Sequence, residues 1–221
     1  MKTIKMACVT VLALLTVAAF TGASPVMAES TALCDQTPEG GFDFPGGTYL
    51  TGEACLEKHR VTHVHETTLE GAKAKLLTSI LNVECDVLFL GDTALTEKWE
   101  SISLASPLVL EGNFTYSNCG NCTVEEVGIG TEIRVLKSGH ETAKVTGEGE
   151  VHVKCTGLNC TYNGEGLLGT AKGWWLSGGV YPNGSVSIWE QTVKKVSGLF
   201  CPSTSKLDIT TTSLSRMFIG S

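Results

Sequence analysis

Three histidines stand close together in the first third of the chain and offer the clearest candidate for metal chemistry. His63 and His65 are one residue apart, so their imidazoles share a face if the segment is a β-strand, and His59 lies just before them. Two imidazoles on one strand can ligate a metal ion, with His140, His152 or a carboxylate such as Glu66 as the third ligand. The same pattern also fits a solvated strand face whose histidines bind nothing. A metal-dependent hydrolase that uses these histidines is therefore kept as an alternative function.

Cys119 and Cys122 form a Cys-Gly-Asn-Cys segment, which is the spacing of dithiol redox sites. Thiol exchange of that type needs the first cysteine at the N-terminus of a helix, where the helix dipole lowers the thiol pKa. The residues from Thr123 onward are β-branched and indicate a strand instead. A thiol oxidoreductase is therefore a second alternative.

Aromatic residues concentrate late in the chain at Trp174, Trp175, Tyr181 and Trp189. Exposed Trp rings stack on sugar faces, so this region is a candidate glycan-binding surface. Neighbouring residues of a strand point to opposite faces, so at most one of Trp174 and Trp175 would be exposed. A Trp that packs into the core is the ordinary alternative.

The sequence contains no nucleophile elbow, zincin motif, phosphate-binding loop or dinucleotide fingerprint. We therefore expect no catalytic residue and no cofactor, and we favour a protein that is not an enzyme.

The first 28 residues have the pattern of a cleavable secretion signal. Lys2 and Lys5 precede an apolar stretch over 6–20, and a small-residue cleavage pattern ends at Ala28. The apolar stretch is too short for a stable membrane span, and none is expected after cleavage. Cleavage removes Cys8 and leaves eight cysteines, which in an oxidising compartment indicate disulfides. These are Cys34, Cys55, Cys85, Cys119, Cys122, Cys155, Cys160 and Cys201.

Two of the expected disulfides are local. Residues 29–58 are rich in Gly and Pro and predict an irregular arm, fixed by a bridge between Cys34 and Cys55. Cys155 and Cys160 enclose four residues that include Gly and Asn, which suits a bridge within one loop.

The remaining cysteines predict longer connections. Gly120 and Asn121 lie between two β-like runs and indicate a two-residue hairpin turn, flanked by Cys119 and Cys122. We expect bridges Cys85–Cys119 and Cys122–Cys201, with a strained Cys119–Cys122 bridge as the alternative.

The chain is acidic after the predicted signal. All 23 Asp and Glu lie beyond residue 28, against 14 of the 16 Lys and Arg, which gives a formal charge of −9. Phosphate backbones and anionic lipid repel such a chain overall, so nucleic acid is not an expected partner.

Period-two patterns dominate the rest of the sequence. From Val145 to Cys155, small or apolar residues alternate with charged and polar ones, as in a half-buried antiparallel strand. Similar short runs recur about every ten residues, between turn signals. The pattern predicts a single all-β domain over residues 59–221, a mostly antiparallel β-sandwich stapled by disulfides.

Four cysteine-bearing strings resemble an uncharacterised family of secreted actinobacterial β-rich proteins. They are EGAKAKLLTSILNVECD (70–86), FTYSNCGNCTV (114–124), VKCTGLNCTY (153–162) and LFCPSTSKLDIT (199–210). The resemblance spans residues 70–214 and implies an exported β-rich fold without an assigned activity. The histidines and the Trp174–Trp175 pair depart from the family pattern.

The sequence thus predicts a secreted, disulfide-stabilised protein that is not an enzyme. Its expected role is binding or association with the cell envelope, with a glycan or an envelope component as partner.

Overall fold

The computed structural model describes residues 30–35, 55, 57, 60–139, 142–173, 183–214 and 217–221. Within these residues the chain forms eleven strands and no α-helix. The strands are β1 (Ala32–Asp35), β2 (His63–Thr68), β3 (Ala74–Leu77), β4 (Asn82–Thr93), β5 (Leu108–Ser117), β6 (Thr123–Gly139), β7 (Thr142–Cys155), β8 (Leu158–Lys172), β9 (Ser185–Ser197), β10 (Thr204–Ser213) and β11 (Met217–Gly220). The predicted signal, residues 1–28, lies outside the described part.

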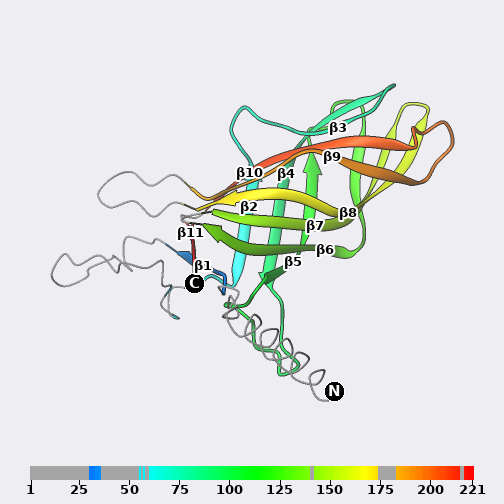
Figure 1. Ribbon diagram of the computed structural model, residues 1–221. Helices are drawn as coiled ribbons and strands as arrows, with labels where there is room; N and C mark the ends of the chain where they lie inside the picture. The colour runs from blue at the N-terminus through cyan, green and yellow to red at the C-terminus, as the bar shows by residue number, and fades with distance from the viewer. Residues whose placement is uncertain are drawn as a thin grey trace, which may run out of the picture.

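Nine of these strands form one antiparallel sheet that closes on itself (Figure 1). Strands β3 to β10 follow one another as a meander, each paired with the next. The ring is closed by β10, which pairs with both β2 and β3. The expected all-β, antiparallel class is confirmed, but the sheet is a closed eight-stranded barrel and the predicted sandwich is wrong.

Two short strands share one position in the barrel wall. Between β4 and β10, β3 occupies one half of the gap and β2 the other. The chain leaves the wall between them through a turn at Gly71. Pairing of β2 and β3 with β10 joins segments more than a hundred residues apart, and this contact turns an open sheet into a barrel.

A separate two-stranded sheet covers one end of the barrel. β1 pairs with β11, and Leu33, Met217 and Ile219 from these strands pack into the core at that end. The bridge Cys34–Cys55 is present, as predicted. Part of the predicted arm is therefore regular structure. Figure 1 shows β1 and β11 side by side, at the opposite end from the β9–β10 turn.

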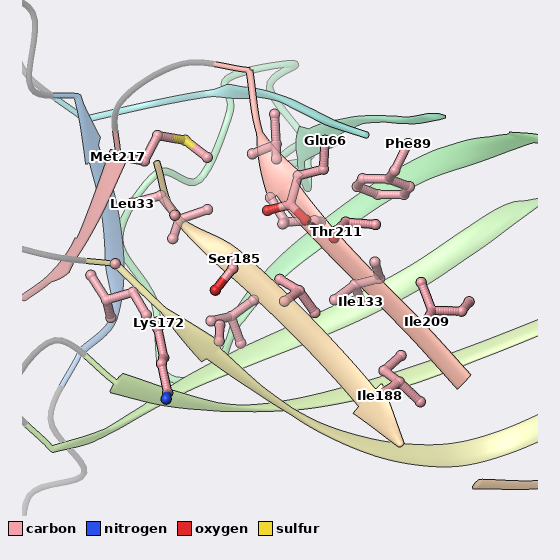
Figure 2. Close-up of a pocket in the computed structure, with 18 of the residues that line it drawn as sticks. Leu33, Glu66, Phe89, Ile133, Lys172, Ser185, Ile188, Ile209, Thr211 and Met217 are labelled. Atoms are coloured by element: carbon pink, nitrogen blue, oxygen red, sulfur yellow. Dashed lines mark hydrogen bonds between the residues drawn. The ribbon is translucent and has the colours of Figure 1, made fainter. Parts of the chain in front are cut away.

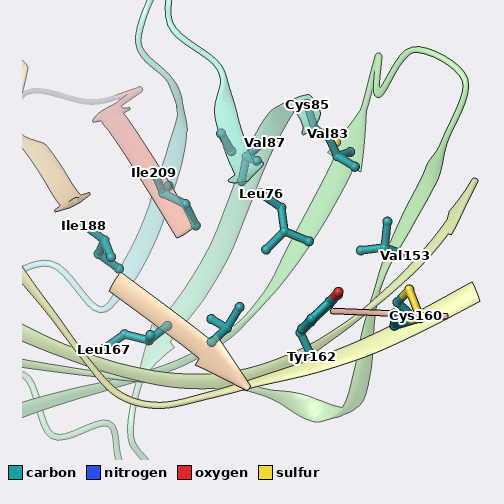
Figure 3. Close-up of a cluster of buried hydrophobic side chains, with 13 residues drawn as sticks. Leu76, Val83, Cys85, Val87, Val153, Cys160, Tyr162, Leu167, Ile188 and Ile209 are labelled. Atoms are coloured by element: carbon teal, nitrogen blue, oxygen red, sulfur yellow. A yellow bond between two sulfur atoms is a disulfide. The ribbon is translucent and has the colours of Figure 1, made fainter. Parts of the chain in front are cut away.

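Alternation along the strands fills the barrel interior with apolar side chains. In β7 the buried residues Ala143, Val145 and Val153 alternate with outward residues such as Lys144 and Lys154, which confirms the period-two prediction. Figure 3 shows the cluster at the end opposite β1 and β11, including Leu76, Val87, Val153, Tyr162 and Ile209.

A large ring packs against the inner wall of the barrel where two glycines leave room for it. The Phe89 ring lies against Gly91 and against Gly112, which is the register partner of Gly91. The centroid of the Phe89 ring is 4.8 Å from the centroid of the Phe114 ring. A Cβ at Gly112 would lie 2.7 Å from Phe89 Cε2 and 2.4 Å from the Leu90 carbonyl oxygen. The glycines are therefore required by close packing of the aromatic ring.

Candidate functional site

The carboxyl group of Glu66 faces the apolar interior of the barrel. Glu66 and Val64 alternate with the histidines on β2, so they point inward and are buried. The Glu66 carboxyl accepts a hydrogen bond from the hydroxyl of Thr211 on β10. Figure 2 shows these two side chains directed toward each other, near Phe89. Burial raises the pKa of Glu66 to about 7, although the Thr211 hydrogen bond acts to lower it.

The space beside Glu66 is small. One cavity of about 50 Å³ lies between Glu66 and the β1–β11 cover. A second cavity of about 50 Å³ lies deeper, and Phe114, Ile133, Ile188 and Ile209 border both. An engineered cavity of about 150 Å³ is the size that holds benzene, so each of these spaces is too small for a bulky ligand. Around Glu66 the described interior is therefore a packed core.

The candidate histidines lie on the outer face of the barrel. His63 and His65 share a face of β2 and are exposed, as the spacing predicts. Glu66 points the opposite way, so it cannot complete a site with them. The His63 imidazole instead hydrogen-bonds to the carboxylate of Asp92 on β4. Among the residues that the structure describes, no three His, Cys, Asp or Glu side chains are grouped to hold a metal ion. His59 lies outside those residues.

Three disulfides staple the barrel wall at one end. Cys85 of β4 bonds to Cys119, as predicted. The predicted Cys122–Cys201 and Cys155–Cys160 pairs are wrong, because Cys122 bonds to Cys155 and Cys160 bonds to Cys201. Cys122 directly precedes Thr123, whose register partner is Lys154, so Cys122 and Cys155 face each other across β6 and β7. Their Cα atoms are 4.2 Å apart.

The dithiol interpretation of Cys119 and Cys122 does not fit this arrangement. The two cysteines flank the predicted turn, in which Cys122 N donates to Cys119 O at 3.3 Å and Gly120 has a φ of 66°. Each cysteine is bonded to a different neighbouring strand. The alternative Cys119–Cys122 bridge is therefore absent, and no strand–helix junction follows the turn to activate a thiol.

Next to this turn the ladder between β5 and β6 opens. Register partners run only from Leu108 to Gly112 on β5, although both strands continue to the turn. Glu126 bridges the opening, since its carboxylate accepts hydrogen bonds from Phe114 N at 2.7 Å and from the Thr131 hydroxyl. Burial, together with the negative charge of Glu126, raises the pKa of Tyr116 at the same place.

Of the four aromatic residues in the predicted glycan region, the structure describes Trp189. It lies on the outer face of β9 and is 65% exposed. Leu168 on the neighbouring strand β8 is also exposed. It lies beside Trp189, because the next residue, Gly169, is the register partner of Ile188. Trp174, Trp175 and Tyr181 lie outside the described residues.

The turns at the stapled end of the barrel contain no charged residues. Four turns meet there, and we call this region the disulfide end. It comprises the turns at 78–81, 118–122, 156–157 and 198–203. None of the four turns contains Asp, Glu, Lys, Arg or His, although 18% of the whole chain is charged. Such a neutral surface is suited to contact with a partner.

The turn between β9 and β10 presents two large apolar side chains to solvent. Leu199 is 82% exposed and Phe200 is 85% exposed, and we call this pair the β9–β10 tip. Phe200 has a φ of 62°, a left-handed conformation that is strained for a bulky residue. The adjacent Cys201 is bonded to Cys160 of β8, so the chain is covalently anchored directly after Phe200.

Close packing behind the tip keeps it turned outward. A Cβ on Gly198 would lie 2.3 Å from the Asn159 carbonyl oxygen and 2.5 Å from Cys201 Sγ, so the turn rests directly on β8 and the disulfide. Lys195 closes the turn from the strand side, where its Nζ donates to the Cys201 carbonyl at 3.2 Å and its N donates to Ser203 O. Sequence reasoning missed this site, although Leu199 and Phe200 lie in a turn framed by Gly198 and Pro202.

The fold defines the class as an all-β, closed antiparallel barrel with four disulfides, which fits an oxidising, extracellular setting. Comparison with protein-family models, with curated proteins and with solved structures finds no match for the chain. The resemblance to secreted actinobacterial proteins therefore stays a prediction. In the part of the chain that the structure describes, no helix is long and apolar enough to cross a membrane.

Proposed function

We propose that this chain is a non-enzymatic, extracytoplasmic binding protein that attaches to the cell envelope through the disulfide end of its barrel. The β9–β10 tip is the observation that carries the proposal. Exposed apolar residues are common singly, but two adjacent large ones above 80% exposure, in a strained and covalently anchored turn, indicate a contact surface.

The barrel supports this role as a rigid scaffold. Its interior is filled by side chains, which favours recognition at the outer surface over enclosure of a ligand. Three bridges hold three of the four turns of the disulfide end without help from a partner, so binding there would cost little ordering entropy.

The proposal is tested by sedimentation of the purified, oxidised protein with isolated bacterial cell envelopes. The wild type should sediment with the envelopes, and the double variant Leu199→Ser/Phe200→Ser should stay in the supernatant. Trp99→Ser is the matched control, because Trp99 is 83% exposed in the β4–β5 connection, at the other end of the barrel. Equal retention of the wild type and the tip variant would overturn the proposal.

A glycan-binding surface is the second candidate, supported by the exposure of Trp189 beside Leu168 on the barrel wall. An exposed indole can stack on a sugar ring and retain a polysaccharide. In affinity electrophoresis on cell-wall polysaccharide, this candidate predicts retardation of the wild type that Trp189→Ala abolishes. Mobility that does not depend on the polysaccharide would exclude it.

A further inference from the structure

We infer that the partner of the disulfide end is the surface of an anionic lipid bilayer, into which the β9–β10 tip inserts Leu199 and Phe200. This inference rests on the proposed function and names the class of partner. It is carried by three features of one hairpin: an apolar tip, a cationic stem and a rigid base.

The stem of the hairpin is cationic in an otherwise acidic protein. Between residues 191 and 207 the charged side chains are Lys194, Lys195 and Lys206, with no acid among them. Lys194 of β9 and Lys206 of β10 are exposed on the outer face of the barrel. Their register partners are Thr204 and Thr192, so the two lysines are diagonal neighbours across the two strands. An ammonium group near an anionic membrane is attracted to the headgroups, and several such groups act together.

The order of these groups along the hairpin matches the layers of a membrane interface. Leu199 and Phe200 come first, followed by Lys195, whose Nζ is held at the Cys201 carbonyl next to the tip. The outward pair Lys194 and Lys206 lies farther along the strands. Apolar side chains enter the boundary between headgroups and acyl chains, while lysines behind them reach the phosphates.

The neighbouring turns do not oppose this contact. In the β3–β4 turn Ile80 is 59% exposed, so it adds apolar surface to the same end of the barrel. The carboxylates that follow it on β4 are compensated locally, Glu84 by Lys75 at 3.3 Å and Asp86 by Lys73. Glu125 lies on β6, on the opposite side of the ring from β10.

The overall negative charge of the chain then sets the orientation. A protein with a formal charge of −9 beyond its predicted signal is repelled from an anionic surface in most orientations. The approach with the β9–β10 tip first brings the uncharged turns and the lysines of this hairpin toward the lipid, while Glu84 and Asp86 at the same end stay paired with Lys75 and Lys73. Binding should therefore be end-on, and it should weaken as salt screens the lysines.

The test is flotation of the oxidised protein with vesicles of phosphatidylcholine containing 30% phosphatidylglycerol, compared with phosphatidylcholine alone. The wild type should float with the anionic vesicles, whereas Leu199→Ser/Phe200→Ser should bind at least tenfold more weakly. Lys194→Gln/Lys195→Gln/Lys206→Gln should also bind at least tenfold more weakly to anionic vesicles. Trp99→Ser should bind like the wild type. An unchanged disulfide map and circular dichroism spectrum confirm that each variant is folded.

Several results would overturn the inference. Absence of wild-type flotation does so, and so does flotation that is unchanged in the tip variant or in the lysine variant. If the vesicles do not bind but the envelopes still retain the wild type and release the tip variant, the proposed attachment stands and its partner is a protein or polysaccharide. If neither assay retains the wild type, both proposals fail.

Discussion

The carboxylate of Glu126 accepts a hydrogen bond from the backbone N of Phe114 at 2.7 Å, where the ladder between β5 and β6 ends. A side chain thus replaces a strand partner at the opening in the barrel wall. Removing it would leave a partly buried N–H without its acceptor, at a cost of about 1–3 kcal/mol. Glu126→Ala should lower the free energy of unfolding by that amount in urea denaturation, and the Phe114 amide should exchange faster.

Glu125→Ala is the control for this prediction, because Glu125 is the exposed neighbour on the same strand. Equal stability of the two variants would show that the bridge contributes nothing. Glu126→Gln keeps an acceptor oxygen, so it should retain most of the stability.

Glu66 makes stability depend on pH. The pKa of its carboxyl is about 7 in the folded protein and near 4.5 in the unfolded chain. Below pH 4.5 both states hold the proton, and between the two values only the folded state does. The contribution of Glu66 to the free energy of unfolding therefore falls as pH rises from 4.5 to 7, by about 3 kcal/mol.

Glu66→Gln should remove this dependence and be more stable than the wild type at pH 8. Denaturation of both proteins across pH 4–8 measures the difference, and Glu165→Gln, at an exposed site on β8, should follow the wild type. A constant difference between wild type and Glu66→Gln over that range would contradict the prediction.

Gly112 should tolerate no side chain. Its Cβ would meet the Phe89 ring and the Leu90 carbonyl oxygen, so Gly112→Ala forces the ring or the strand to move. We expect a loss of about 1–3 kcal/mol by thermal denaturation. At Gly147, also in the wall, a Cβ meets nothing within 4 Å, so Gly147→Ala should cost clearly less. Equal losses would mean that the contact with Phe89 does not matter.

Proteolysis of the non-reduced protein should yield peptides joined as Cys122–Cys155 and Cys160–Cys201. The Cys122–Cys155 bridge spans 33 residues, a length for which loop entropy predicts about 3–4 kcal/mol. Cys122→Ser/Cys155→Ser should therefore unfold at lower denaturant concentration. A peptide joining Cys155 to Cys160 would refute the assigned connectivity.

Local patterns in the sequence predicted local structure well. The alternation in Val145–Cys155 and the turn at Gly120 are both present, because side-chain period and turn chemistry depend on neighbouring residues. Barrel closure depends on β10 meeting β2 and β3, which alternation cannot reveal, since a sandwich strand and a barrel strand have the same period.

The wrong disulfide predictions also arose because the pairing of the strands was unknown. Cys155 pairs in register with Leu158, and Cys160 pairs with Val153, so the two cysteines lie on a diagonal of the β7–β8 ladder. Diagonal Cα atoms are about 7–8 Å apart, too far for a bridge, and knowledge of the register was needed to see it. The inward position of Glu66 could have been found, because Val64 and Glu66 share a face in any strand that exposes His63 and His65.

The stapled turns let the surface of the disulfide end change without a change in the fold. Cys119, Cys122 and Cys201 fix the chain where it leaves the wall, and Leu199 and Phe200 make little contact with the barrel behind them. Exposed residues of these turns can then be substituted, and the turns can be lengthened, without disturbing the interior. The same end of the barrel is thus a natural position for grafting new recognition loops in protein engineering.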